Sequence, residues 1–151
     1  MDLNLNNNNK MNVKCIFNTG KNIPISLYTL YGYTKNTIFD SLTIGKSYTV
    51  YSIFTMKGEL WYLVCPDFFN GTNYNYPEFY PSTLFEVTDT TPSKYWITKP
   101  AKDDYDKENK LVNNTGFINV INEEFFYGNL VEGNEREILL FKEYKQLIDS
   151  E

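Results

Sequence analysis

The chain contains no histidine among its 151 residues. This absence removes the commonest general base, the commonest metal ligand and the base of every Ser-His or Cys-His catalytic pair. Cysteine is almost as rare, because Cys15 and Cys65 are the two present and they lie far apart in apolar stretches. Two cysteines without histidine do not complete a tetrahedral zinc site. We therefore expect no metal ion and no cofactor, and two buried free thiols rather than a disulfide.

Long hydrophobic runs are missing as well. No stretch of the sequence approaches the roughly 18 apolar residues of a membrane-spanning helix. The first residues have neither the basic start nor the apolar core of a secretory signal. We therefore expect a cytoplasmic protein that has no membrane partner.

The sequence has no glycine-rich phosphate loop and no nucleophile elbow. A pair of carboxylates, Glu59 with Asp67 or Glu78, is the remaining arrangement for acid–base chemistry, for example on a sugar. These residues occupy ordinary turn and strand-edge positions in the pattern described below. We therefore predict that the protein is not an enzyme, and a carboxylate enzyme is the least favoured of three functional classes.

A surplus of positive charge is also absent, and the net charge is −5. Residues 1–97 carry seven basic and seven acidic side chains, whereas residues 98–151 carry seven basic and twelve acidic ones. The whole excess therefore lies in the last third of the chain. Because phosphate repels such a chain at long range, we expect no nucleic-acid partner. The same field speeds the encounter with a basic protein, which is the partner that the charge favours.

Aromatic side chains, in contrast, are abundant and make up 17% of the chain. Between positions 42 and 96, short β-branched and aromatic runs alternate with Gly, Pro and Asn. This pattern is typical of a small antiparallel barrel. Strands predicted over 48–54 and 59–65 form a hairpin through the turn at 57–58. The short strand predicted over 76–80 contains a proline, which places it at a sheet edge.

Three motifs within this segment resemble those of SH3-like modules. They are Gly45-Lys46-x-Tyr48-x-Val50, the pair Trp61-Tyr62 at the start of a strand, and Tyr80-Pro81-Ser82-x-Leu84-Phe85 before a final strand. The last motif is similar to the Pro-Ser-x-Tyr-Val turn of SH3 domains. The whole pattern resembles that of small uncharacterised bacterial proteins with an SH3-like β-barrel core, and this resemblance implies a barrel of five or six strands.

The predicted fold class is therefore mainly β (α+β), a small SH3-like antiparallel barrel with a C-terminal strand and an amphipathic helix packed outside it. Residues 1–12 are predicted to be a disordered leader and 13–98 the barrel domain. Residues 99–112 are predicted to be a charged linker. Residues 113–151 are predicted to be a C-terminal strand–helix extension of the same domain.

Within the extension, we expect a strand over 116–121 and a helical turn over 123–127 that ends at Gly128. The strongest helix signal covers 135–148, where apolar residues recur with helical spacing. Asn134 suits the N-cap, and Glu137 follows three residues later as in a capping box. The apolar face of this helix has to be buried, and the barrel is the expected partner.

Two surfaces are candidates for partner binding. The first is a groove lined by aromatic side chains of the barrel segment, namely Trp61, Tyr62, Tyr74, Tyr76, Phe79 and Tyr80. The alternative is that strand alternation buries about half of them and leaves the rest as edge cover. The second is an acidic face formed by Glu123, Glu124, Glu132, Glu135 and Glu137. Its alternative is an ordinary solvated helix flank.

These observations favour a non-catalytic intracellular binding protein. An acidic inhibitor of a basic protein partner, of the toxin-immunity type, is the first expectation. The alternative is an SH3-like peptide-binding or regulatory module, which the aromatic surface favours. The sequence does not identify the partner.

Overall fold

The computed structural model describes residues 10–68, 76–101 and 113–151. Its strands are β1 Asn12–Cys15, β2 Ser47–Thr49, β3 Ser52–Met56, β4 Glu59–Val64, β5 Glu78–Pro81, β6 Phe85–Asp89, β7 Trp96–Pro100 and β8 Asn113–Phe117. Its helices are α1 Ser26–Tyr31, α3 Ile118–Asn122, α4 Phe126–Val131 and α5 Glu135–Asp149, with 3₁₀ turns η1 Gly20–Asn22 and η2 Ser82–Leu84. None of the helices in the described ranges has the length and apolar character that crossing a bilayer requires.

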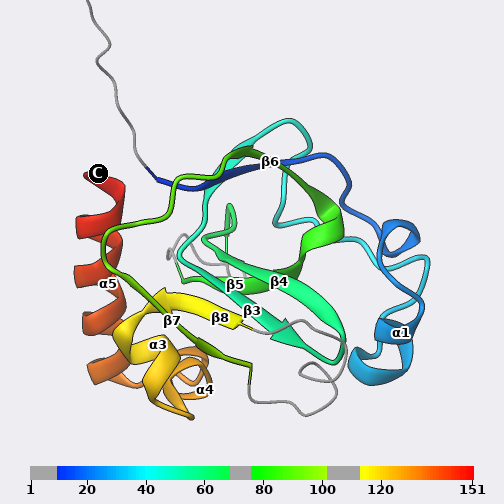
Figure 1. Ribbon diagram of the computed structural model, residues 1–151. Coiled ribbons are helices and arrows are strands. Elements are labelled where there is room, and N and C mark those ends of the chain that lie inside the picture. The colour runs from blue at the N-terminus through cyan, green and yellow to red at the C-terminus, as the bar shows by residue number, and fades with distance from the viewer. Residues whose placement is uncertain (1–9, 69–75, 102–112) are drawn as a thin grey trace, which may run out of the picture.

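The strands form two antiparallel sheets (Figure 1). The three-stranded sheet has the order β2-β1-β6, and the five-stranded sheet has the order β5-β4-β3-β8-β7. The prediction of a mainly β, α+β fold is confirmed. The predicted SH3-like barrel is not confirmed, because the ladders between described strands leave two separate sheets and close no barrel.

The chain passes from one sheet to the other between Thr49 and Ser52. The Val50 N–H donates to the Met11 carbonyl at 3.0 Å, next to the three-stranded sheet. The following N–H, that of Tyr51, donates to the Leu63 carbonyl at 2.8 Å in the five-stranded sheet. The continuous strand predicted over 48–54 is therefore two strands, β2 and β3, that meet at a bend.

The predicted hairpin is present as β3 and β4. Its two turn residues, Lys57 and Gly58, have φ of 52° and 83°, as a type I′ turn requires. The predicted edge strand is also present, because β5 lies at one end of the five-stranded sheet. The sequence pattern thus located the three strands, β3, β4 and β5, that line the site described below.

Two clusters of buried side chains fill the interior. The first lies between the sheets and joins Val13 of β1 to Tyr62 of β4 and to Leu27 of α1. The second lies on the other face of the five-stranded sheet, where Leu63 of β4 packs with Phe141 of α5 and other residues of α3 and α4. Figure 1 shows α3, α4 and α5 grouped together, with α1 apart from them. Both faces of the five-stranded sheet are therefore covered.

The C-terminal extension differs from its prediction in part. The strand β8 ends at Phe117, and residues predicted to continue it form α3 instead. Gly128 lies inside α4 rather than at the end of a helical turn. Buried Val120 and Ile121 are adjacent along α3 and enter the second cluster together. A continuous strand would point these two neighbours to opposite faces, so burial of both favours the helix.

The helix predicted over 135–148 is confirmed as α5, which runs to Asp149. Asn134 occupies the N-cap position, but its side chain makes no capping hydrogen bond. Glu137 does not complete a capping box either, because the Asn134 N–H donates to the Asn129 carbonyl at 3.0 Å. The Glu137 carboxylate instead lies 2.9 Å from the guanidinium of Arg136. The apolar face of α5 packs on β8 and the second cluster, where the Phe117 and Tyr144 rings stack at 4.8 Å.

The described residues also bear on the ends of the predicted segments. Met11 is buried in the first cluster and Asn12 begins β1, so the folded part starts before position 13. Lys99 and Pro100 belong to β7 rather than to a linker. The rest of the predicted leader, residues 1–9, and of the predicted linker, residues 102–112, lie outside the described residues.

Candidate functional site

A largely apolar cleft of about 430 Å³ opens between the segments that contain α1 and α4. Tyr31 and Tyr33 line one side, Tyr127 and Gly128 line the other, and Trp61 of β4 lies between. Trp61 is 2% exposed and forms the floor. A cavity of this size lies within the range of ordinary ligand sites.

Gly32 explains why two tyrosines of one short segment reach the same side of the cleft. It ends α1 with φ of 71°, a left-handed conformation that glycine adopts readily, and its N–H donates to the Tyr28 carbonyl at 3.0 Å. The turn lets Tyr31 and Tyr33 stack, with ring centroids 6.1 Å apart. Tyr31 also meets Trp61 edge to face at 5.0 Å.

The opposite side is built on β3, β5 and α4. The Phe79 ring lies 5.0 Å from Phe54 and 4.8 Å from Tyr127. The Tyr127 hydroxyl accepts a hydrogen bond from the Phe79 N–H at 3.4 Å. Phe126, the neighbour of Tyr127, is buried in the second cluster and anchors α4. The rings that face the cleft are therefore fixed by ring contacts and by the helix anchor.

Glu78 brings a carboxylate to this aromatic surface. The hydroxyl of Tyr80 donates to Glu78 Oε2 at 2.7 Å, and the Ser41 hydroxyl lies 2.8 Å from the same Tyr80 oxygen. Tyr80 is 3% exposed, so this hydroxyl is held from below the surface. The Glu78 carboxylate is consequently oriented by the buried Tyr80 hydroxyl, which the half-buried Ser41 hydroxyl contacts in turn.

The electrostatics of the cleft are negative. Glu124 also lines it and is exposed, and no lysine or arginine is among the described residues that line it. Burial and, to a smaller extent, the nearby Glu78 charge raise the pKa of Tyr127 to about 12, although the hydrogen bond from the Phe79 N–H opposes this shift. Burial, followed by the charge of Glu78, likewise raises the pKa of Tyr33. These tyrosine hydroxyls therefore stay protonated, and the acidic side chains at the cleft are Glu78 and Glu124.

The structure separates the predicted aromatic surface into two groups. Trp61, Tyr62 and Tyr80 are buried, at 2%, 6% and 3% exposure, so they do not form an open groove. Tyr76 and Phe79 are half-buried, and Tyr74 lies outside the described residues. The burial follows from the covering of both faces of the sheet. Of the predicted residues that the structure describes, Trp61 and Phe79 line the cleft, Trp61 as its floor.

The predicted acidic face is also divided. Arg136 pairs with Glu123 at 2.7 Å and with Glu137 at 2.9 Å, and Glu137 is buried. The exposed members are Glu124, Glu132 and Glu135. Glu124 alone of the predicted acids lies at the cleft, where it joins Trp61 and Phe79.

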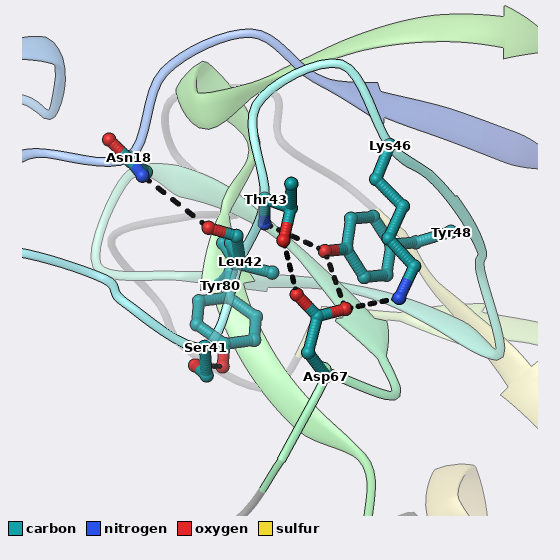
Figure 2. Close-up of polar contacts among 8 residues, drawn as sticks. All are labelled: Asn18, Ser41, Leu42, Thr43, Lys46, Tyr48, Asp67 and Tyr80. Atoms are coloured by element: carbon teal, nitrogen blue, oxygen red, sulfur yellow. Dashed lines mark hydrogen bonds and ion pairs between the residues drawn. The ribbon is translucent and has the colours of Figure 1, made fainter.

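A second group of polar residues, the Asp67 cluster, consists of Thr43, Lys46, Tyr48 and Asp67 (Figure 2). Thr43 Oγ1 donates to Asp67 Oδ2 at 2.5 Å, and the Tyr48 hydroxyl donates to Oδ1 at 3.1 Å. Lys46 forms an ion pair with the same carboxylate. Burial raises the pKa of Asp67, but these three hydrogen bonds outweigh it and hold that pKa below its usual range. The cluster fixes the loop before β2 to the segment after β4.

A polar pocket of about 450 Å³ adjoins this cluster and includes Lys10, Lys46, Lys145, Asp67 and Asp149. Lys145 Nζ lies 2.5 Å from Asp149 Oδ2, and Lys10 Nζ donates to the Asp149 carbonyl at 2.7 Å. Each of these lysines therefore already has an internal oxygen partner, which reduces its attraction for an anionic ligand. The aromatic cleft, whose carboxylates have no cationic partner in the described ranges, is the stronger candidate.

Other features of the described residues bear on the remaining expectations. Cys15 and Cys65 are free thiols, as expected, and burial raises the pKa of both. In the described ranges, no three His, Cys, Asp or Glu side chains gather in a way that would hold a metal ion. The chemistry that the cleft offers is a set of aromatic faces and two carboxylates, which together attract cations.

Sequence reasoning did not single out Tyr31, Tyr33 or Tyr127, and it considered Glu78 only as half of a weak carboxylate pair. The left-handed Gly32 between two tyrosines was a local signal for the first pair. Tyr127 and Glu78 had no local signal, because their meeting depends on how α4 packs on β5. Comparison of the chain with protein-family models, curated proteins and solved structures found no match.

Proposed function

We propose that this chain is a non-catalytic, cytoplasmic binding protein whose partner is a basic protein. The observation that carries the proposal is the cleft in which Trp61 and Phe79 meet the carboxylates of Glu78 and Glu124. Aromatic residues near the centre of an interface commonly supply much of its binding energy. These carboxylates have no ion-pair partner among the described residues, so they favour a positively charged partner.

The charge of the whole chain supports the same partner. A net charge of −5 attracts a basic protein at long range and raises the association rate. Glu132 and Glu135 extend the negative surface beyond Glu124, because both are exposed. An acidic inhibitor of a basic protein, as toxin-immunity proteins are, is the form of this function that we favour.

A closer assignment of the fold, to an SH3-like barrel of the bacterial kind, belongs to the proposal too. Its support is the bend between β2 and β3, at which the chain leaves one sheet for the other. Further support is the 3₁₀ turn η2, which follows the Tyr80-Pro81 motif and leads into β6. The peptide-binding module remains the second candidate, favoured by the aromatic lining of the cleft.

The test has two stages. The immobilised protein captures partners from a native lysate, and mass spectrometry identifies them. The main captured protein is then purified, and its association rate is measured by surface plasmon resonance over a series of salt concentrations. We expect a basic protein whose association rate falls as salt rises, because salt screens long-range attraction.

Charge reversal makes the test specific for a surface. Changing Glu124, Glu132 and Glu135 to Lys moves the net charge from −5 to +1, since each change adds two charges. The control changes exposed Asp40, Glu86 and Glu143 to Lys and gives the same net charge. We expect the first triple to slow association by about tenfold or more at low salt, and the control to slow it much less. Equal effects, or an acidic partner, would overturn the proposed function.

A further inference from the structure

The aromatic cleft has two features that a purely apolar groove lacks. One is Glu78, which is half-buried and whose Oε2 is held by Tyr80 at 2.7 Å. The other is exposed Glu124 on the opposite side. Neither carboxylate has an ion-pair partner in the described part of the chain. The cleft therefore provides negative charge that the described part of the fold does not neutralise.

The walls of the cleft favour a cation that can lie on aromatic rings. Tyr31 and Tyr33 stack on one side, and Tyr127 stands on the other. A cation over an aromatic face is attracted by the negative charge of that face. Rings beside carboxylates therefore select a positively charged group over a neutral one of the same shape.

Arginine fits this surface better than lysine does. A guanidinium is planar and more weakly hydrated than an ammonium, so it enters a largely apolar cleft at lower cost. Its N–H groups form a fork that pairs with a carboxylate while its plane lies on a ring. The Tyr80 hydroxyl donates to Oε2 of Glu78, so Oε1 is the oxygen that can accept from a guanidinium N–H. We propose that the cleft between α1 and α4 binds the side chain of an arginine presented by the basic partner protein.

This inference rests on the proposed function and deepens it, because it names the group of the partner that is recognised. The cleft determines which partner binds. The acidic surface around Glu132 and Glu135 raises the rate at which that partner associates. A partner that lost this one arginine would still approach at a high rate, but it would dissociate faster.

The test uses the full chain and a short glycine-flanked peptide with one arginine. Matched peptides carry citrulline, lysine or trimethyllysine in its place, and agmatine serves as a free guanidinium. Binding is followed by two-dimensional NMR through the backbone signal of Gly128 and the indole N–H signal of Trp61. We expect the arginine peptide to shift both signals in a saturable way. Citrulline should bind about tenfold more weakly, because it retains the shape but not the charge.

Two variants test the cleft itself. Glu78→Gln keeps the shape and removes the charge, and we expect about a fivefold or greater loss of affinity for the arginine peptide. Gly128→Leu fills the cleft from α4, where a Cβ would meet no heavy atom within 4 Å, and we expect loss of saturable binding. Glu86→Gln, exposed on β6, is the control and should bind as the unchanged chain does. The dispersion of the NMR spectrum shows that each variant is folded.

The possible outcomes are distinct. Equal affinity for citrulline, tighter binding of either lysine peptide, or unmoved Gly128 and Trp61 signals overturns the arginine assignment. If that happens while a basic partner still binds the charge-dependent surface, the proposed function stands and the cleft inference fails. If agmatine and the arginine peptide bind equally well and no basic protein is captured, the site recognises a free guanidinium and the proposed function fails.

Discussion

Buried Tyr80 donates its hydroxyl hydrogen to Oε2 of Glu78 at 2.7 Å. The two residues lie two positions apart on β5, so their side chains leave the same face of the strand. Tyr80 does not line the cleft, although the sequence pattern placed it in a candidate aromatic groove. It acts instead as a positioning residue, because it fixes the carboxylate that faces the cleft.

This relationship predicts the effect of Tyr80→Phe. The change removes one hydroxyl that bridges Ser41 and Glu78, and we expect a loss of about 1 kcal/mol in unfolding free energy. Affinity for the arginine peptide should also fall, by about two- to fivefold, because Glu78 loses its orientation. Urea denaturation and NMR titration measure the two effects.

A matched control exists on the other side of the sheet. Tyr51 is equally buried, and its hydroxyl donates to Asp149 Oδ1 at 2.6 Å. Tyr51→Phe should cost a similar amount of stability and leave arginine affinity unchanged. If both variants weaken binding equally, Tyr80 has only a structural role.

The sequence predicted those elements of the fold whose signals are local. The β3–β4 hairpin was predictable because Lys57-Gly58 suits a turn with two positive φ values, and α5 was predictable from helical spacing of its apolar residues. The burial of Trp61, Tyr62 and Tyr80 was not predictable. Alternation along a strand distinguishes its two faces, but it does not show that both faces are covered. The cleft depends on α1 and α4 packing near β5, which no local pattern encodes.

Asp67 predicts a dependence of stability on acid. Its pKa in the folded chain is below the 3.8 of an ordinary aspartate. A carboxylate with a lowered pKa stabilises the fold above the unfolded value, and this contribution is lost as pH falls through the folded pKa. Asp67→Asn should therefore lower unfolding free energy at pH 7 by about 1–3 kcal/mol, since charged hydrogen bonds are lost. The difference from the unchanged chain should shrink below about pH 3.8.

Chemical denaturation at a series of pH values measures this dependence. Exposed Asp40→Asn is the control, and its unfolding free energy should stay within about 0.5 kcal/mol of that of the unchanged chain at each pH. A deficit for Asp67→Asn that stays constant down to the acid limit would show that the Asp67 cluster does not depend on the carboxylate charge.

Substitution by alanine is expected to change stability in opposite directions at two glycines, Gly128 and Gly116. At Gly128, inside α4, a Cβ meets no heavy atom within 4 Å, so Gly128→Ala should stabilise the chain by about 0.5–1 kcal/mol. At Gly116 in β8, a Cβ would lie 2.3 Å from Ser52 Oγ and 2.9 Å from Val120 Cγ1. Gly116→Ala should therefore destabilise by about 1–3 kcal/mol, because the packed interior must shift. Thermal unfolding of both variants side by side tests the contrast, and a stable Gly116→Ala would contradict the close packing of α3 on β8.

The last prediction concerns the ion pairs that Arg136 makes with Glu123 and Glu137. Glu137 is buried, so Arg136→Met leaves its charge without an ion-pair partner in the described residues. A buried pair that loses one member commonly costs about 3–5 kcal/mol. Because Arg136 is itself 58% exposed, solvent screens the pair, and we expect a clearly smaller loss of unfolding free energy than that.

Adding Glu137→Met to that variant removes the buried charge along with its partner, and stability should return to within about 1 kcal/mol of the original. The double-mutant cycle, completed with Glu137→Met alone and measured by urea denaturation, should then give a favourable coupling between the two residues. Additive effects would show that Glu137 is stabilised without Arg136.

Arg136→Met also frees Glu123, so the chain becomes more negative beside Glu124. Association with a basic partner should therefore become faster at low salt even as the fold becomes less stable. These opposite signs separate a role in recognition from a role in folding.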